Sequence, residues 1–533
     1  MPGRTVVQWD KEDCADLRII KVDLLGLGMM AVIEDCLELI PRHYRVPVDL
    51  AQLPEDKEVY ETLQRADTVG MFQVESRAQM ASLPLNYPKM FYDLVVQVAI
   101  IRPGPIVGEM MHPYMRRRQG REKITYPHPL LESVLKRTLG VPLFQEQLLR
   151  MAMVVANFTG AEAEELRRAV GMRRSWERMK NLEGKLRAGM TANSIDAATQ
   201  DQIVQNISSF ALYGFPESHA ASFALIAYAS AYFKVKYPAA FTCAILNNQP
   251  MGFYSPAVLV KDAQRHGLRV KPINVQASEW PCTIEQQQDG TLSLRMGLGY
   301  VKHLRKASAE ALVKSRALEG AFHSAEDLAR RRFPLLTEEE LKTLARVGAL
   351  NEIEGIEHRR DALWQVERAG KLEGPLFSQQ SEWLREEFET HPLIQMSTEE
   401  RLVADYAGTG LTIGKHPMSY HRAELREQRV LSAEELRKHK DGEFVHTAGC
   451  VIARQRPGTA KGFIFLSMED ETGIANVIIT PDLYDRDRLL VTRSKFLLVE
   501  GVLQNRDNVV HVKATRLMAL SDRALKLSSH DFH

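Results

Sequence analysis

Helix-like spacing of apolar residues dominates the first half of the chain. Between residues 31 and 275, amphipathic patterns such as those at 162–172 and 201–213 alternate with turns that contain Pro or Gly. Apolar residues that recur every three or four positions predict helices with one buried face. No repeat of fixed period is visible. This region is therefore expected to be a helical domain.

Strand-like alternation replaces the helical pattern near the end of the chain. Five short segments alternate apolar and polar residues and are separated by Gly and Asp, namely FVHTAGCVIA, FIFLSMED, IANVIIT, SKFLLVEGVL and NVVHVKATRL. Five strands within about 75 residues are typical of a small barrel. We therefore expect an OB-fold at the C-terminal end.

A further β-rich run stands near the start, from Leu17 to Asp23. Its apolar and branched residues predict a buried strand, but one strand is not stable alone. We expect its partner strands to lie upstream of this sequence. The fold class is then multidomain and mainly α, with one terminal strand and a C-terminal β-barrel. The expected units are 1–30, 31–275, 276–355, 356–443, 444–520 and a tail at 521–533.

The composition of the chain is that of a globular protein. The chain has 533 residues, a formal net charge of +1, 45% hydrophobic and 26% charged residues, which are ordinary values for a globular protein. Five scattered cysteines contain no CxxC pair, so neither a disulfide framework nor a zinc site is expected. The N-terminus has no signal-peptide pattern, and the longest apolar stretch, 222–233, is too short to span a bilayer. A cytoplasmic protein without membrane contact is expected.

Charge is unevenly distributed. Residues 102–187 contain 17 Lys and Arg but 9 Asp and Glu, a net of +8, so the remainder sums to −7. A basic segment in a neutral chain is typical of a face that meets phosphate. Solvated arginines would give the same pattern.

Lys21 and Asp23 are the first candidates for chemistry. On a strand, positions two apart point to the same face, so a lysine and a carboxylate would emerge together. Such a pair could bind Mg²⁺ and face a triphosphate. A helix cap or a buried ion pair is an alternative.

Two arginine motifs follow. The stiff Pro103-Gly104-Pro105 turn would hold Arg102 extended, as a clamp for phosphate or carboxylate or as part of a salt bridge. Arg167 and Arg168 lie in a predicted helix and could present guanidinium forks to phosphate. A solvated helix face is the alternative for this pair.

Two further motifs surround the helical region. In GMFQVESRAQM, polar residues from Gln73 to Arg77 could position a substrate, but a helix-capping segment is favoured. Ser218 and His219 begin a long apolar helix, whose N-terminus is a potential anion site. A capping histidine would look the same. No nucleophilic triad can be argued.

The C-terminal half carries candidate DNA contacts. Gly297 and Gly299, with Lys302, and a weaker copy at Gly348, resemble helix-hairpin-helix turns whose amides hold phosphate. A Gly C-cap would look the same. In the barrel, basic and aromatic side chains could bind a single strand, namely Arg454, Arg456, Lys461, Phe463 and Phe465. We expect at least one of the two phenylalanines to be buried.

The order of the motifs is more specific than any one of them. IKVDLLGLGMM, GMFQVESRAQM, IIRPGP, LFQEQ, LRRAVGMRR and YGFPESHAASFALIAYASAYFKVKYPAAF resemble, in this order, the bacterial C-family DNA polymerase III α subunit. The resemblance covers nearly the whole chain. It is greatest to the error-prone, ImuC-type branch, through VDLLGLGMM, QVAIIRPGP and GLTIGKHPMSYHR. It implies a DNA-directed DNA polymerase of damage-induced translesion synthesis.

The resemblance also implies domain names and residue roles. The units would be the end of the palm, the fingers, a helix-hairpin-helix region, a helical connector and the OB-fold. Asp23 matches the third palm carboxylate, a ligand of Mg²⁺, and Lys21 matches a lysine that faces the incoming nucleotide. Arg167 and Arg168 match the fingers arginines, and Ser218 and His219 match the start of the long apolar helix. Implied partners are primer-template DNA, deoxynucleoside triphosphates, ImuA- and ImuB-type accessory proteins and, indirectly, the sliding clamp.

One departure from the family is large. The acidic stretch DKEDCAD is not the PDIDVDF-like motif that supplies the other two palm carboxylates. Two-metal transfer needs two ions about 4 Å apart, which one carboxylate cannot hold. We therefore expect a C-terminal half that binds DNA but does not extend a primer by itself. A non-catalytic DNA-binding scaffold is the alternative. A PDIDVDF-like motif encoded upstream would favour the polymerase.

Overall fold

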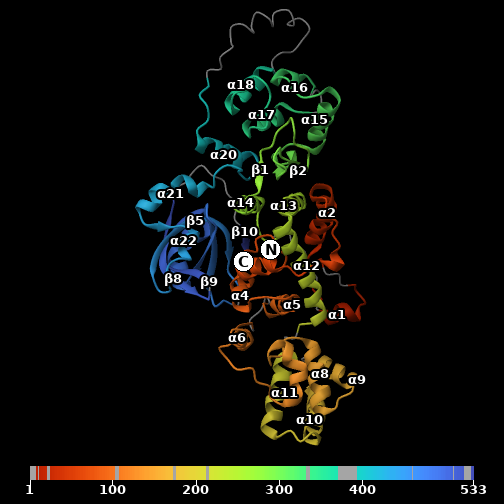
Figure 1. Cartoon of the computed structure of the whole chain (residues 1–533). Coiled ribbons are helices and arrows are strands. Elements are labelled where there is room, and N and C mark those ends of the chain that lie inside the picture. Colours follow the sequence, from red (N-terminus) through yellow and green to blue (C-terminus); the bar gives the residue numbers. More distant parts are fainter. Residues whose placement is uncertain are drawn as a thin grey trace, which may run out of the picture.

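The computed structural model describes residues 8–9, 11–20, 24–101, 107–171, 176–211, 215–331, 336–369, 393–458, 460–507, 509–520 and 530–532. Figure 1 shows helices α15–α18 at one end of the molecule, helices α8–α11 at the other end, and the barrel beside the middle. The expected fold class, helical domains followed by a C-terminal barrel, is confirmed.

The start of the chain differs from the sequence expectation. α1 covers Lys11–Asp16, and residues 17–20 form a turn and an irregular stretch in place of the expected strand. The side chains of Leu17, Ile19 and Ile20 are exposed. No strand pairs with them in the described part of the chain, which is why the β-rich composition alone does not produce a strand. Lys21 and Asp23 lie outside the described residues.

The middle of the molecule is built around α12, Glu217–Lys236, which is apolar on nearly all sides. Two cores meet on it, and their residues come from helices on both flanks. A helix without a polar face is stable only when it is surrounded. The surrounding helices are α2 (Leu27–Tyr44), α3 (Lys57–Gln64), α4 (Arg77–Asn86), α5 (Phe91–Ile100), α6 (Val107–Arg118) and α13 (Pro238–Asn247).

A separate helical lobe carries the basic segment. Its core residues lie on α7 (Glu132–Leu135), α8 (Gln145–Ala156), α9 (Gly160–Gly171), α10 (Trp176–Ala192) and α11 (Ala197–Ala211). Short 3-10 turns cover Leu50–Gln52, Pro129–Leu131 and Lys136–Thr138. The helices predicted at 162–172 and 201–213 are confirmed, with slightly different bounds.

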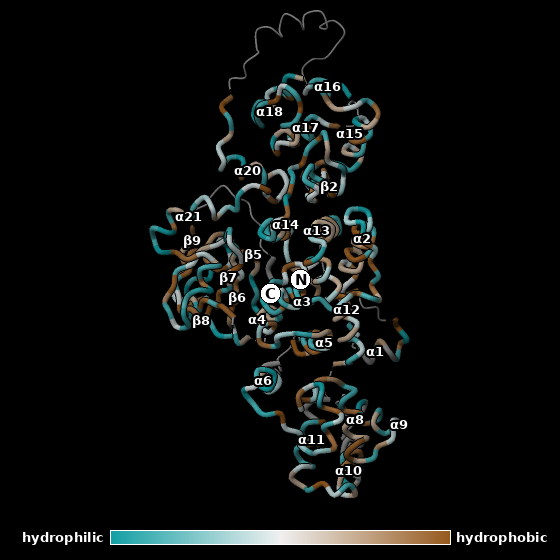
Figure 2. Tube along the Cα trace, viewed as in Figure 1, coloured by the Kyte–Doolittle hydropathy of each residue, from teal (hydrophilic) through white to brown (hydrophobic). Residues whose placement is uncertain are grey.

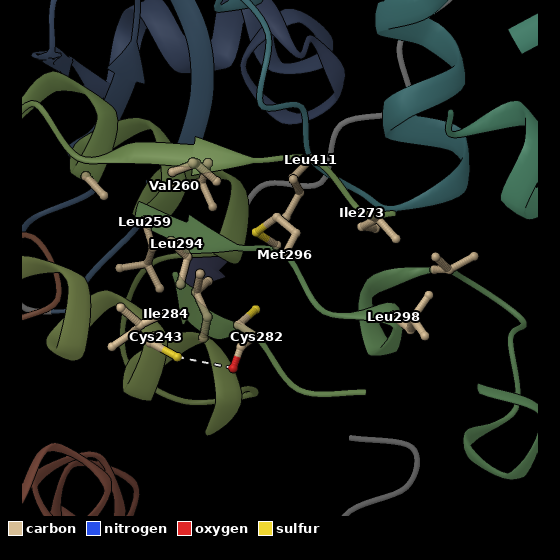
Figure 3. Packing of buried hydrophobic residues seen from close by; sticks show 14 of the residues in the cluster. Cys243, Leu259, Val260, Ile273, Cys282, Ile284, Leu294, Met296, Leu298 and Leu411 are labelled. Atoms are coloured by element: carbon tan, nitrogen blue, oxygen red, sulfur yellow. Dashed lines mark hydrogen bonds between the residues drawn. The ribbon is translucent and has the colours of Figure 1, made fainter. Parts of the chain in front are cut away.

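A small three-stranded sheet follows along the chain. α14 (Pro256–Arg265) leads into β1 (Arg269–Lys271), which pairs with β3 (Leu292–Arg295), and β3 pairs with β2 (Thr283–Gln286). Figure 3 shows Leu259 and Val260 of α14 packed near Ile284 and Leu294 of the sheet. In the same core the Cys243 thiol donates to the carbonyl of Cys282 at 3.2 Å.

The sheet joins a group of small helices that shares its core. They are η4 (Leu298–Tyr300), α15 (Lys306–Glu319), α16 (Ala325–Arg331), α17 (Glu338–Arg346) and α18 (Arg359–Ala369). The connector contains α20 (Thr398–Gly408), α21 (Pro417–Glu427), β4 (Val430–Leu431) and α22 (Ala433–Leu436). Its apolar residues pack against the barrel strands.

The five predicted barrel strands are all present. They are β5 (Phe444–Gln455), β6 (Ile464–Glu469), β7 (Ile474–Ile479), β8 (Phe496–Arg506) and β9 (Val509–Ala519). The pairing of β5 with β8 closes the sheet, which otherwise runs in the order β5-β6-β7-β9-β8. The sequence analysis missed α23 (Pro481–Arg493), between β7 and β8, and β10 (His530–Phe532), which pairs with β5.

Hydrophobic and hydrophilic residues are mixed along the trace in Figure 2. Among the described helices, none is both long enough and apolar enough to cross a bilayer. This includes α12, most of whose apolar surface is covered by the cores described above, with Leu225 exposed.

Candidate nucleotide and nucleic-acid site

Two motifs that are 70 residues apart in the sequence meet at the N-terminus of α12. Phe144 and Phe215 form an isolated parallel bridge, and the amide of Gln145 donates to the carbonyl of Phe215 at 3.0 Å. The Glu146 carboxylate then accepts from the amide of Glu217 at 2.8 Å. The LFQEQ segment therefore supplies an acidic cap for the helix that begins with Glu217-Ser218-His219. Sequence reasoning quoted this segment but did not single out Glu146.

His219 lies between two aromatic rings in the first turn of α12. Its ring centroid is 5.1 Å from that of Phe215 and 4.2 Å from that of Phe223. Phe223 in turn meets Phe72 edge-on at 5.4 Å. Three of the sequence motifs thus converge on this end of α12. Ser218 lies beside His219 and is exposed.

The N-terminal glycine motif reaches the same place. Gly26 has a φ of +94°, and a β-carbon added there would lie 3.1 Å from Cζ of Phe72. A side chain at this position would be both strained and crowded, which explains the glycine. The segment just after Asp23 therefore packs against Phe72, although Asp23 itself is outside the described residues.

The GMFQVESRAQM segment caps a helix and joins two loops. The hydroxyl of Ser76 accepts from the amide of Gln79 at the start of α4, which confirms the capping interpretation. Glu75 accepts from the amides of Gly70 at 3.0 Å and Phe253 at 2.9 Å. Burial raises the pKa of Glu75 to about 7, against the opposing effect of these two amides.

Arg167 lies on α9 and is paired within its own helix. Its guanidinium contacts Glu164 at 2.7 Å, with both side chains about one-third exposed. The hydrogen bonds that Arg167 donates to Glu164 raise the pKa of Arg167, and the charge of Glu146 adds to this effect. Arg167 therefore lies within electrostatic range of the acidic cap of α12. The Arg168 side chain, and Arg102, are outside the described residues.

A second cation is linked to this helix end through Tyr92. The Tyr92 hydroxyl donates to Glu217 at 2.8 Å, and the guanidinium of Arg137 lies 4.4 Å from the centroid of the Tyr92 ring. Burial is the main reason that the pKa of Tyr92 is raised. Arg137 is exposed, so it is available to a ligand that approaches this end of α12. Sequence reasoning counted Arg137 only as part of the basic segment.

Much of the basic segment is internally neutralised. Within the described residues, ion pairs join Arg116 and Arg117 to Glu122, Arg118 to Asp93, Lys185 to Glu162 and Arg187 to Glu183 and Asp201. Glu122, Glu162 and Glu183 belong to the segment and are already counted in its net charge of +8, so only Asp93 and Asp201, which lie outside it, offset that charge further.

The Gly297–Gly299 turn directs its amides inward. The amide of Leu298 donates to the carbonyl of Glu279 at 2.8 Å, and that of Gly299 donates to Trp280 at 2.9 Å. A β-carbon at Gly297 would lie 2.4 Å from the carbonyl carbon of Pro281. The glycines allow two backbone segments to approach closely, and the amides expected to hold phosphate are engaged within the protein.

Lys302 and Gly348 also have internal roles. The ammonium of Lys302 donates to the carbonyls of Tyr406 at 2.8 Å and Ala407 at 3.2 Å, in the last turn of α20. Gly348 has a φ of +82° just after α17, and its amide donates to Ala345. This geometry is that of a helix C-cap, the alternative that the sequence left open.

The barrel candidates divide into two groups. Arg454 is buried, and its guanidinium donates to the carbonyls of Val491, at 2.7 Å, and Ser494 at the end of α23. Arg456 is exposed and lies over the Tyr484 ring at 4.7 Å, and Lys461 is exposed in the loop before β6. Phe463 and Phe465 are both partly exposed, so the expectation that one is buried is wrong.

The outer face of β6, β7 and β9 is contacted by the helical domain. Ile464 and Leu466 point into the barrel core, which places Phe465 on the outside. The guanidinium of Arg77, from α4, lies 4.4 Å from the centroid of the Phe465 ring. It also contacts the carbonyl of Val477 at 3.5 Å and Nδ1 of His511 at 3.4 Å.

The electrostatics of this contact are unfavourable. Removal from water lowers the pKa of Arg77 to about 9, and no carboxylate pairs with it among the described residues. Removal from water, together with Arg77, lowers the pKa of His511 to about 4. A cation held against a ring and a neutral imidazole, without an anion, is costly to bury.

One cluster in the described residues could hold a metal by its composition. Oxygen and nitrogen atoms of Asp67, Asp262 and His266 lie within 4.8 Å of one another, beside a cavity of about 220 Å³. The ammonium of Lys234 already lies 2.7 Å from Asp262 and 4.0 Å from Asp67. A resident ammonium neutralises these carboxylates, so the cluster does not fit the Mg²⁺ pair of a phosphoryl-transfer site.

Three family models match this chain, in the order of its structural units. Residues 29–194 match the bacterial DNA polymerase III α subunit finger domain, residues 267–362 match a helix-hairpin-helix motif, and residues 445–520 match the OB-fold nucleic acid binding domain. The three matches are of the same kinds, fingers, helix-hairpin-helix and OB-fold, as the units expected from the sequence.

Curated relatives match over the whole chain. The chain is 46% identical to the error-prone DNA polymerase of Anaeromyxobacter sp. (strain K), covering 100% of this chain and 48% of that protein. Identity is 45% to the error-prone DNA polymerase of Alkalilimnicola ehrlichii, of which the chain covers 51%. It is 43% to error-prone DNA polymerase 2 of Rhizobium meliloti, of which it covers 49%. The chain spans about half the length of the curated relatives it matches.

Proposed function

Because this chain belongs to the error-prone branch of the C-family DNA polymerases, we propose that it supplies the fingers, helix-hairpin-helix and OB parts of a DNA-directed DNA polymerase. The proposed reaction adds a deoxynucleotide to a primer 3′-OH during damage-induced translesion synthesis. The observation that carries the proposal is the 42 to 46% identity to error-prone DNA polymerases along all 533 residues. The activity is a proposal because the chain spans about half of these relatives.

The end of α12 is the proposed nucleotide site. Arg167 lies within electrostatic range of Glu146, Arg137 stacks on Tyr92, which binds Glu217, and His219 lies in the first turn of α12. All three side chains are compatible with recognition of a triphosphate. The resemblance adds Lys21, Arg168 and Ser218 to this site, and the stiff Pro103-Gly104-Pro105 turn adds Arg102. Glu146 already neutralises the helix N-terminus. We therefore propose that the arginines, and not the helix dipole, provide most of the attraction for phosphate.

Asp23 is the proposed ligand of a divalent metal, and Mg²⁺ is the proposed ion. The Asp67–Asp262–His266 cluster is excluded from this role by Lys234. Because one carboxylate is not expected to hold the ions, a spectroscopic test with Mn²⁺ as the probe would compare a complete polymerase that contains this chain with its Asp23→Asn variant. Loss of bound Mn²⁺ in the variant supports the assignment, and unchanged binding removes Asp23 from the metal site.

The proposed DNA contacts in the barrel are the exposed candidates Arg456, Lys461 and Phe463. The proposed substrates are primer-template DNA and deoxynucleoside triphosphates. ImuA- and ImuB-type accessory proteins and the sliding clamp are proposed partners, and the cytoplasm is the proposed location. These partners rest on the family resemblance alone.

Nucleotide binding separates a polymerase part from a DNA-binding scaffold. We expect the chain to bind a fluorescent deoxynucleoside triphosphate in the presence of primer-template DNA, and Arg167→Ala to weaken this binding by about tenfold. Arg187→Ala is the matched control, because Arg187 has the same exposed fraction of 36% and a similar ion pair. DNA binding without any affinity for the triphosphate would favour the scaffold.

A further inference from the structure

Two arginines of the helical domain contact the barrel face that a single strand would use. In OB-folds the second and third strands, with the loops after the first and fourth strands, form the oligonucleotide-binding face. Here these strands are β6 and β7, and Phe465 stands on their outer side. Phe465 opposes Ile478 in the strand register, and Ile478 opposes Lys513 of β9. The face thus combines an aromatic ring with a cation, as single-strand sites do.

The Arg77 guanidinium lies where a stacked base would lie. It is centred 4.4 Å from the middle of the Phe465 ring. Arg77 also approaches the Val477 carbonyl and His511, so it extends across the neighbouring strands. A planar guanidinium and a nucleobase both use the flat face of an aromatic ring, and the same face of Phe465 cannot accept both at once.

A second contact covers the loop between β8 and β9. Arg121, which follows α6, forms an ion pair with Asp507 in that loop, with one nitrogen–oxygen distance of 3.1 Å. The helical domain therefore contacts both the strand face and the loop that an oligonucleotide would use.

The barrel has an independent anchor. Glu469, at the other end of β6 from Phe465, is buried and binds Arg265 of α14 at 2.9 Å. His416, which caps α21, also lies near Glu469 at 3.6 Å. Loss of the Arg77 contact would therefore uncover the Phe465 ring, while Glu469 at the other end of β6 stays attached to α14.

We propose that Arg77 is an autoinhibitory latch that occupies the single-strand site of the barrel and must leave Phe465 before single-stranded DNA can stack there. The proposal rests on the proposed function in that it takes the barrel to be a DNA-binding unit. The absence of an anionic partner for Arg77 among the described residues makes the latched state easy to displace. Phosphates of an incoming strand could then pair with the released guanidinium.

The test measures binding of a fluorescent oligothymidylate of about 20 nucleotides to the full chain by anisotropy. Arg77→Ala removes a positive charge, so a simple electrostatic contact predicts weaker binding. The latch predicts the opposite, a gain of about tenfold if the open state is about a tenth of the population. Arg77→Ala combined with Phe465→Ala should lose this gain, because the stacking surface is then absent.

Arg488→Ala is the matched control, since Arg488 is exposed on α23 and its loss changes the charge equally. It should not tighten binding. Should Arg77→Ala fail to fold, Asp507→Asn weakens the second contact and should also tighten binding, more than the control Asp482→Asn on α23 does.

An Arg77→Ala affinity equal to or weaker than that of wild type overturns the latch while leaving the barrel as a DNA-binding unit. A lack of single-strand binding by every variant overturns the latch and also this part of the proposed function. Tighter oligonucleotide binding by Arg77→Ala that is lost when Phe465→Ala is added supports both the latch and the DNA-binding role of the barrel.

Discussion

The ammonium of Lys302 donates to the carbonyl of Tyr406 at 2.8 Å, in the final turn of α20. The last carbonyls of a helix lack partners within the helix and carry partial negative charge. A lysine from the helix-hairpin-helix region therefore satisfies the end of the connector helix, and it links two units that are about 100 residues apart in the sequence.

Lys302→Met should reduce stability by about 1 kcal/mol, because two carbonyls at the end of α20 lose their charged donor. The free energy of unfolding from urea titration measures this, and DNA affinity should change little. Lys306→Met is the control, since Lys306 is largely exposed in a long ion pair with Glu310. A large loss of DNA affinity in Lys302→Met with unchanged stability would restore Lys302 as a DNA contact.

Gly297→Ala should destabilise the helix-hairpin-helix region by at least about 2 kcal/mol. The added β-carbon would meet backbone atoms of Trp280 and Pro281 at 2.4 to 2.6 Å, and backbone cannot move aside as a flexible side chain can. Hydrogen exchange of η4 and β3 would measure the loss. Gly184→Ala, in α10, meets no atom within 4 Å and should instead stabilise its helix by about 0.5–1 kcal/mol. Equal effects of the two substitutions would contradict the close approach.

Arg454→Met should destabilise the barrel by about 2 kcal/mol, because the carbonyls of Val491 and Ser494 would lose their donor in a buried setting. Thermal unfolding of the barrel measures this effect. The matched variant is Arg456→Ala, two residues further along the chain. Its exposed guanidinium should matter little to stability but should contribute to single-strand affinity. If Arg454→Met instead weakened single-strand binding and left the stability of the barrel unchanged, Arg454 would be a DNA contact and not a structural residue.

Acidification should weaken the packing of the barrel against α4. The pKa of His511 is about 4 in the folded chain, well below the usual 6.5, because the ring is desolvated and faces Arg77. Between pH 4 and pH 6.5, the folded state therefore binds fewer protons at His511 than the unfolded state does. Its stability is full above pH 6.5 and falls by up to about 3 kcal/mol as the pH drops to 4.

His511→Gln removes this titration and should flatten the stability profile between pH 6.5 and 4. The His511 ring proton, followed by NMR, should also titrate at higher pH in Arg77→Ala, because the neighbouring cation is then absent. An unchanged His511 titration in that variant would contradict direct contact between the two side chains.

The local pattern of the sequence determined most of the secondary structure. Period-two alternation located all five barrel strands, since each strand buries one face in the core. Period-3.6 spacing located α9 and α11 for the same reason. The C-cap role of Gly348 was also accessible, because a positive φ after a helix is a local requirement. The Leu17–Asp23 run shows the limit, since apolar composition makes a strand only where another strand pairs with it.

Only the tertiary structure decided what the charged side chains contact. Lys302 and Arg454 have the composition of phosphate-binding residues, yet each binds carbonyls at the end of a helix that lies elsewhere in the chain. Arg77 meets Phe465 across 388 positions of sequence, and Glu146 caps α12 from 71 positions away. Periodicity records which face of an element is buried, because burial repeats along that element. It carries no record of which distant carbonyl or ring a long cationic side chain will reach, since folding alone brings those partners together.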